Sequence, residues 1–208
     1  NKLFNLYYGW WKNIDKFILF LILFLFSLGL FFSLVSTSII ASDKLNTNTY
    51  YFFIKHLLFF ILGVFILITF SAIDKGRLFQ ISKYLFIIFF IFLALVPFIG
   101  IEVKGSMRWI DLPLIPRFQP IEILKPFLII MISTIFTLNN QKHLYFKYLF
   151  SFLIIFPVIL FLISQPDLGQ TILIVLTWFS LIFVSGINLL YFFGFFIITF
   201  SILFYLVF

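Results

Sequence analysis

Length, composition and charge together place this chain in a membrane. Its 208 residues are 64% hydrophobic and only 10% charged, with 36 phenylalanines, no cysteine and a net charge of +7 at pH 7. A soluble domain has too little interior to bury so much apolar surface, so the solvent must be lipid. The lack of cysteine in this sequence excludes disulfides and thiolate metal sites. Most Lys and Arg residues lie in short loops, where membrane topology and anionic lipid account for them, so nucleic acid is not an expected partner.

The apolar runs predict transmembrane helices rather than barrel strands. Only helices and closed barrels satisfy every backbone polar group inside a bilayer. The runs reach about 20 residues and do not alternate with period two, which favours helices. We therefore expect an all-α polytopic membrane protein, with residues 1–208 forming a single transmembrane domain. The predicted spans are 17–41, 56–73, 84–101, 119–138, 147–164, 168–187 and 189–208.

Two features at the end of the chain remain open in the sequence. Only "SGINLL" separates the last two predicted spans, so a broken helix pair is the alternative interpretation there. The chain also stops within an apolar run at Phe208, with no anchoring charge after it. We therefore expect a C-terminally incomplete fragment of a longer protein.

The positions of Lys and Arg predict a cytoplasmic N-terminus. In that orientation eight of these residues lie inside and six outside, a weak majority for the positive-inside rule. Four of the outside six fall between residues 104 and 125, and without them the count is eight to two. This stretch therefore carries charge for a reason other than topology, and we expect it to face outward beside the membrane.

The loop at residues 104–118 is the first of three polar stretches, and it has two interpretations. Arg and Lys at a membrane surface can grip a diphosphate, Arg through its planar fork and Lys as a point charge. The same residues can instead anchor the loop among lipid headgroups, with the tryptophan in an aromatic belt. The polar and aromatic residues in question are Lys104, Arg108, Trp109, Asp111 and Arg117.

The second stretch, "QPIEILKP" at residues 119–126, opens the fourth predicted span. Pro120 suits the first turn of a helix, and Glu122 and Lys125 are then spaced to pair on one face. Pro126 removes the hydrogen bond to the carbonyl of Glu122 and should bend the helix beside this pair. A polar cavity would satisfy these groups, and a structural ion pair that fixes helix packing is the alternative.

The third stretch is "SQPDLGQT" at residues 164–171. Asp167 precedes a long apolar run, so it can simply cap the sixth helix. In the predicted topology, however, its carboxylate lies on the same outer side as Arg108 and Glu122. His56 and His143 are isolated, and no phosphate loop or catalytic triad pattern is present, so neither a metal nor a cofactor is indicated.

The motifs "VKGSMRWIDL" (103–112), "FQPIEILKPF" (118–127) and "QPDLGQT" (165–171) resemble those of the SEDS family of shape, elongation, division and sporulation membrane proteins. They occur in the family's order and on the same predicted side. The segments "KPF", "GQT" and "GWWKNIDK" are more similar to the division branch than to the elongation branch.

The resemblance implies a peptidoglycan glycosyltransferase of the bacterial cytoplasmic (inner) membrane that polymerises lipid II during cell division. Family members have ten spans and work with a class B penicillin-binding protein and other divisome membrane proteins. Their catalytic aspartate lies in the outer loop after the seventh span, so we expect no catalytic residue before Phe208.

The resemblance also implies a set of substrate-binding residues. Arg108, followed by Lys104, would stabilise the leaving diphosphate. Glu122 and Lys125 would shape the cavity, and Asp167 would support its wall or orient a cation. Ile121 stands where the family usually has serine. The full predicted set is Lys104, Arg108, Gln119, Glu122, Lys125, Gln165 and Asp167.

Two other functions are compatible with this resemblance. A lipid II flippase would use the same cavity, but it should have polar groups along both leaflets. Here the inner halves of the spans are nearly all Phe, Ile and Leu, which favours chemistry at the outer face. A non-catalytic division scaffold is the better description if the protein truly ends at Phe208.

Overall fold

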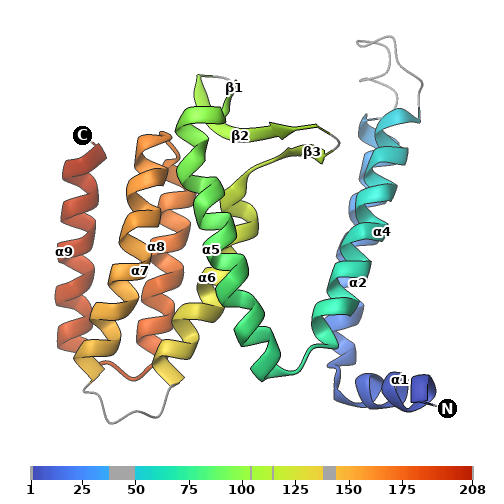
Figure 1. Ribbon diagram of the computed structural model, residues 1–208, viewed down its shortest axis with the longest axis horizontal. Coiled ribbons are helices and arrows are strands. Elements are labelled where there is room, and N and C mark those ends of the chain that lie inside the picture. Colours follow the sequence, from blue (N-terminus) through green and yellow to red (C-terminus); the bar gives the residue numbers. More distant parts are fainter. Residues whose placement is uncertain (1, 38–49, 104, 114, 138–143, 208) are drawn as a thin grey trace. The chain divides into compact units, whose positions relative to one another are not determined.

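The computed structural model describes residues 2–37, 50–103, 105–113, 115–137 and 144–207 (Figure 1). The chain separates into two compact units, Asn1–Lys75 and Gly76–Phe208. Five of the described helical segments are long and apolar enough to cross a membrane: Lys16–Val35, Phe53–Ser71, Lys75–Ile99, Pro120–Thr137 and Phe146–Ser164.

In the first unit, a short helix lies across the ends of two longer helices that pack together (Figure 1). Asp15 caps the first long helix by accepting hydrogen bonds from the backbone N–H groups of Phe17 and Ile18, at 2.9 and 3.1 Å. The short helix is tied down where the Trp10 indole donates to Ser71 Oγ at 2.9 Å. This short helix lies outside the seven predicted spans. The elements are α1 (Lys2–Asn13), α2 (Lys16–Phe32), the π-helical turn η1 (Ser33–Thr37) and α4 (Tyr51–Ser71).

The second unit packs five helices and a small sheet. Each of the seven predicted spans coincides with a helix over its described residues. Residues 38–41 of the first span and residue 208 of the last lie outside the described residues, and the sixth span ends at Val184 rather than at 187. The last two spans are separate helices, because the backbone turns at Gly186, whose φ of 87° suits a residue without a side chain. The helices are α5 (Lys75–Ile99), α6 (Pro120–Thr137), α7 (Leu144–Ser164), α8 (Leu168–Val184) and α9 (Leu189–Val207).

The charged stretch between α5 and α6 is an antiparallel sheet of three strands, β1 (Ile101–Val103), β2 (Ser106–Leu112) and β3 (Ile115–Phe118). Burial alternates along β2, so Arg108 lies on the same face as the fully buried Ile110. The expectation of a loop over residues 104–118 is therefore wrong for the described strands. The alternation in "SMRWIDL" is short and stands between long helical runs, so it is a weak strand signal.

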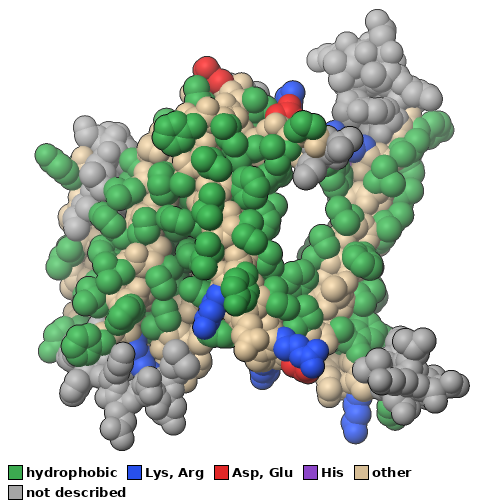
Figure 2. Space-filling model, in the orientation of Figure 1, with side chains coloured by type: hydrophobic (Ala, Val, Ile, Leu, Met, Phe, Trp, Pro, Cys, Tyr) green, Lys and Arg blue, Asp and Glu red, His purple; other side chains and the backbone are tan. Residues whose placement is uncertain are grey.

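The core of the second unit lies where α5, α6, α7 and α8 meet. Leu93, Leu124, Ile155 and Trp178 have at most 1% of their surface exposed there. Hydrophobic side chains also cover the visible outward faces of the helices (Figure 2). In water such a surface would drive aggregation, whereas a bilayer solvates it, so these faces are expected to contact lipid.

One buried hydrogen bond in this core generates a stability prediction. The Trp178 indole N–H donates to Ser151 Oγ at 3.0 Å, and both residues are buried. Ser151→Ala leaves the indole N–H without this acceptor, so the protein should lose about 1 kcal/mol of stability. Thermal unfolding in detergent measures the loss as a lower midpoint temperature.

The matched control for this experiment is Ser180→Ala. Ser180 is exposed and its hydroxyl only donates to the carbonyl of Leu176 in its own helix, at 2.9 Å. This control should unfold at the temperature of the unmodified protein. Equal midpoints for all three proteins would show that the buried hydrogen bond does not stabilise the core.

Candidate functional site

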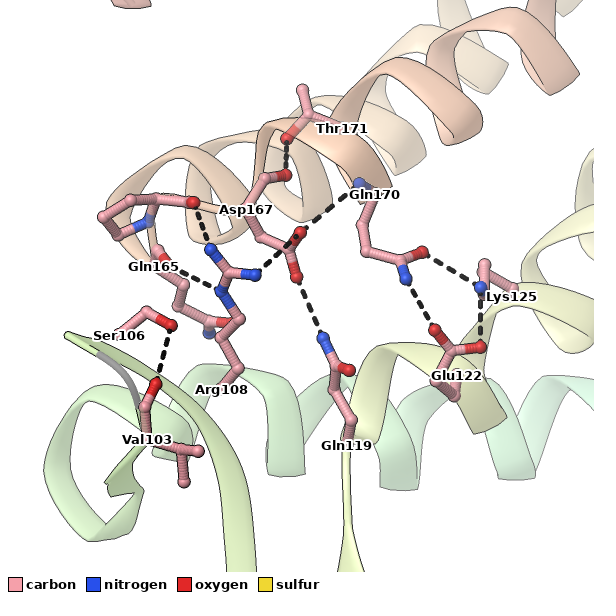
Figure 3. A network of polar contacts seen from close by, with 11 residues as sticks. Val103, Ser106, Arg108, Gln119, Glu122, Lys125, Gln165, Asp167, Gln170 and Thr171 are labelled. Atoms are coloured by element: carbon pink, nitrogen blue, oxygen red, sulfur yellow. Dashed lines mark hydrogen bonds and ion pairs between the residues drawn. The ribbon is translucent and has the colours of Figure 1, made fainter. Parts of the chain in front are cut away.

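The three polar stretches of the sequence meet in one cluster of the second unit (Figure 3). Arg108 comes from β2, and a glutamine comes from the residue before α6. A glutamate and a lysine come from the first turns of α6, and the remaining groups come from the turn between α7 and α8. Six of the seven predicted binding residues are in this cluster, and the seventh, Lys104, lies outside the described residues. The six are Arg108, Gln119, Glu122, Lys125, Gln165 and Asp167.

Arg108 ties the sheet to the turn between α7 and α8. Its guanidinium donates from Nε to the carbonyl of Gln165 at 3.3 Å and from Nη2 to the carbonyl of Pro166 at 2.5 Å. Its Nη1 lies 3.5 Å from Oδ1 of Asp167. A guanidinium has five N–H groups, so after these three contacts at least two of them are not bonded to the turn between α7 and α8. The side chain as a whole is 31% exposed.

Asp167 is buried, with 4% of its surface exposed, and both of its carboxylate oxygens are engaged. Oδ1 accepts from the backbone N–H of Gln170 at 3.4 Å, which makes Asp167 the N-cap of α8. Oδ2 accepts from Nε2 of Gln119 at 2.9 Å. The predicted capping role is therefore present, and the same carboxylate also joins α8 to β2 and to the residue before α6.

A second group of contacts surrounds Lys125. Its ammonium lies 2.7 Å from Oε2 of Glu122, as the spacing of three residues predicted. It also donates to Oε1 of Gln170 at 2.9 Å, while Nε2 of Gln170 donates to Oε1 of Glu122 at 2.6 Å. Helix α6 begins at Pro120 as predicted, so Glu122 lies in its first turn, where the helix dipole favours a negative charge.

Gln170 was not among the predicted site residues. The motif containing it was visible in the sequence, but its partners on α6 lie more than 40 positions away. Gln170 links the two groups of contacts, since its backbone N–H reaches Asp167 and its amide reaches both Glu122 and Lys125.

The side chain of Gln165 is hydrogen-bonded to a backbone carbonyl of α5 that a proline leaves without its helical partner. Pro97 has no N–H, so the carbonyl of Leu93, four residues earlier, loses its helical partner. The side chain of Gln165, which is 3% exposed, donates from Nε2 to that carbonyl at 3.3 Å. The polar stretch before α8 thus supplies the hydrogen bond that the proline removed from α5.

Other polar residues of the sheet do not join this cluster. Arg117 pairs with Asp111 across β2 and β3 at 2.8 Å, and both side chains are largely solvent-exposed. Trp109 is 37% exposed, on the opposite face of β2 from Arg108. Among the described residues, no group of three or more His, Asp or Glu side chains is arranged to hold a metal ion.

The cluster combines two cations with two carboxylates, so its formal charges balance before any ligand binds. Chemically, it offers fixed donors on Arg108 at the edge of a buried polar network. Such an arrangement can bind an anionic group without rearranging, because the protein contacts already hold the guanidinium in place.

The sequence model of a family described as cell cycle proteins, FtsW, RodA and SpoVE, matches residues 16–208. The chain belongs to this family. It is the SEDS family that the three motifs indicated, and the prediction is confirmed. Membership, together with the apolar helices, makes this a multi-pass membrane protein.

Two curated SEDS relatives are each named probable peptidoglycan glycosyltransferase FtsW. The protein from Wigglesworthia glossinidia brevipalpis is 30% identical over 177 residues, which cover 84% of this chain and 46% of the relative. The protein from Haemophilus influenzae is 28% identical over 185 residues, covering 86% of this chain and 46% of the relative. The chain thus spans about half the length of these relatives.

Two solved structures have a fold similar to that of this chain. The crystal structure of the rod shape determining protein RodA from Thermus thermophilus matches with a TM-score of 0.60 and 24% identity, covering 77% of this chain and 54% of that one. A peptidoglycan synthase complex that coordinates polymerisation and crosslinking matches with a TM-score of 0.58 and 24% identity, covering 76% of this chain and 47% of that one.

The hydrogen bonds that Gln170 forms with Glu122 and Lys125 lead to a second prediction about stability. Gln170→Leu keeps the size of the side chain but removes its hydrogen bonds to Glu122 and Lys125, so stability should fall by about 1 kcal/mol. Gln80→Leu is the control, because Gln80 lies exposed on α5 and its replacement should change stability by less than about 0.5 kcal/mol. Thermal unfolding of both variants measures the difference, and a Gln170 variant as stable as the control would contradict the linking role.

Proposed function

We propose that the protein containing this chain is a peptidoglycan glycosyltransferase that polymerises lipid II into glycan strands during cell division. The observation that carries the proposal is the Arg108 guanidinium, fixed at three points on the α7–α8 turn while it keeps free donors. The names of the FtsW relatives supply the reaction class. Lipid II is a disaccharide-pentapeptide on undecaprenyl diphosphate, and its anionic diphosphate suits these donors.

In this reaction the 4-hydroxyl of the acceptor sugar attacks C1 of the donor sugar. The new C–O glycosidic bond forms as the bond from C1 to the diphosphate oxygen breaks, and undecaprenyl diphosphate leaves with the electron pair. The hydroxyl proton passes to a general base, which the family resemblance assigns to an aspartate in the outer loop after the seventh span. Negative charge grows on the departing diphosphate, so a fixed Arg108 stabilises the transition state more than the ground state.

The other residues of the cluster hold Arg108 and shape the site. Asp167 and the carbonyls of the α7–α8 turn orient the guanidinium, and Gln119 fixes the Asp167 carboxylate. Glu122 and Lys125 form the wall on the α6 side, where their mutual pairing limits the charge exposed to lipid. Gln165 anchors the turn to α5. Lys104 is proposed as a second cation for the diphosphate on sequence grounds alone.

Partners follow from the same proposal. The matched peptidoglycan synthase complex couples polymerisation with crosslinking. A class B penicillin-binding protein is therefore the proposed crosslinking partner, and other divisome membrane proteins are proposed from the FtsW names of the relatives. Transport of lipid II receives less support, because the two ion pairs of the site, Arg108 with Asp167 and Glu122 with Lys125, both lie at the sheet end of the second unit.

Replacing Arg108 tests the proposed reaction. In the full-length protein with its partner, Arg108→Ala should lower glycan polymerisation by about 100-fold, the usual cost of losing one fixed donor to a developing oxyanion. Arg108→Lys should restore only part of the rate, since an ammonium cannot reproduce the planar fork. The measurement is glycan chain formation from purified lipid II.

The matched control is Arg117→Ala, which removes an exposed arginine of the same sheet whose ion-pair partner among the described residues is Asp111. Its polymerisation rate should stay within about twofold of the unmodified protein, because surface ion pairs contribute little. Thermal unfolding of each variant separates loss of activity from loss of fold. A stable Arg108→Ala protein that polymerises normally would remove Arg108 from the reaction.

The proposed location is the bacterial cytoplasmic (inner) membrane, with the N-terminus in the cytoplasm and the site facing outward. The lack of cysteine in this sequence makes the orientation testable with single cysteines. In intact cells a membrane-impermeant maleimide should label Met107→Cys in β2 but not Gly76→Cys at the start of α5. Lysis should make Gly76→Cys reactive. Labelling of only Gly76→Cys in intact cells would reverse the proposed topology.

A further inference from the structure

The short helix α1 separates its residues into a polar side and an apolar side. Helical spacing places its lysines, asparagines and glycine on one narrow side, and the other positions from Leu3 to Trp11 are all Leu, Phe, Tyr or Trp. The helix lies across the ends of α2 and α4, which are long and apolar enough to cross a membrane (Figure 1). An amphipathic helix placed in this way suits the membrane interface. The positions of the polar side are Lys2, Asn5, Gly9, Lys12 and Asn13.

Two connections hold α1 at the level where the spans end. Only Ile14 and Asp15 separate α1 from α2, whose apolar span begins at Lys16. The Trp10 indole N–H also donates to Oγ of Ser71, the last residue of the α4 span, at 2.9 Å. Trp10 belongs to the apolar side of α1, so this hydrogen bond turns that side toward the spans. The polar side is then left for lipid headgroups and water.

The apolar side of α1 carries exposed aromatic rings. Tyr8 is 64% exposed and Trp11 is 39% exposed. Tyr and Trp are enriched where a membrane meets water, because each combines an apolar ring with a polar O–H or N–H group. These two rings therefore suit the boundary between the headgroups and the acyl chains.

Two lysines lie beside this aromatic side where α1 meets α2. Lys12 is in the last turn of α1, Lys16 is the first residue of α2, and both are exposed. The Lys16 ammonium lies 5.6 Å from the centroid of the Trp11 ring, in reach of a cation–π interaction. Asp15 is the single acidic residue among residues 1–16, and its carboxylate caps α2. Positive charge therefore predominates at this junction.

We propose that α1 lies in the membrane interface and that Lys12 and Lys16 bind the phosphate of an anionic phospholipid beside Trp11. A basic residue at an anionic membrane surface contributes on the order of a fivefold preference for anionic over zwitterionic lipid. The ligand is a lipid headgroup rather than free phosphate, because the connections to α2 and Ser71 hold both lysines at the edge of the bilayer. This lipid site is independent of the proposed reaction, since none of its residues belongs to the Arg108 cluster.

The first measurement determines how deeply α1 lies in the bilayer. A nitrobenzoxadiazole fluorophore is attached to Tyr8→Cys or to Asn13→Cys in a cysteine-free background of the full-length protein, which is placed in vesicles. Lipids that carry a nitroxide on the acyl chain should quench the fluorophore at position 8, whereas aqueous iodide should quench it at position 13. Iodide quenching at position 8 would overturn the interfacial placement. Quenching of position 8 by neither agent would also overturn it, because protein would then cover this side of α1.

The second measurement tests the choice of lipid. Nitroxide-labelled phosphatidylglycerol and phosphatidylcholine are compared as quenchers at position 8, each as the same trace fraction of phosphatidylcholine vesicles. Phosphatidylglycerol should be enriched about fivefold or more beside α1. Combining Lys12→Gln with Lys16→Gln should abolish this enrichment. About 1 M salt should do the same, because the Debye length falls to about 3 Å, while position 8 stays in the lipid.

The matched control is Lys55→Gln. Lys55 is an exposed lysine of the same unit, near the end of α4 that lies opposite Ser71. Its replacement should leave the enrichment of phosphatidylglycerol at position 8 unchanged. Equal quenching by the two lipids in the protein that retains both lysines would overturn the lipid site, and so would an enrichment that persists in the Lys12 and Lys16 double variant.

Discussion

The buried carboxylate of Asp167 is the interaction on which the polar site depends. A carboxylate that is 4% exposed is costly to keep ionised unless charged and hydrogen-bonding partners surround it. Here β2 provides Arg108, α6 provides Gln119, and α8 provides its own first-turn N–H group. Three elements must therefore converge at this position, and that convergence sets the place where the sheet rests on the helices.

Proline has a related effect on the surrounding helices. Pro97 and Pro126 each leave a carbonyl one turn earlier without its helical donor, which lipid cannot replace. The side chain of Gln165 donates a hydrogen bond to the first of these carbonyls, that of Leu93. A helix break that would be a defect against lipid thus becomes a fixed attachment point for the α7–α8 turn.

The sequence predicted those features that depend on local rules. Apolar run length located the helices, proline preference located the start of α6, and helical spacing paired Glu122 with Lys125. The sheet escaped prediction because its strands are short and its pairing joins residues across turns. The roles of Gln170 and of the Leu93 carbonyl escaped because their partners lie 45 to 72 positions away in the sequence. Tertiary contacts of that kind leave no periodic signal along the chain.

Charge balance explains how such a site can exist beside lipid and still attract an anion. Arg108 and Lys125 are each paired with a carboxylate, so the empty cluster places no net formal charge at the membrane boundary. A site that relied on net positive charge would bind any anion, including lipid headgroups. Here recognition must instead come from the direction of the spare guanidinium donors, because the turn between α7 and α8 fixes them before a ligand arrives. A neutral site with fixed donors therefore favours a ligand whose anionic oxygens match the directions of these donors over a free anion.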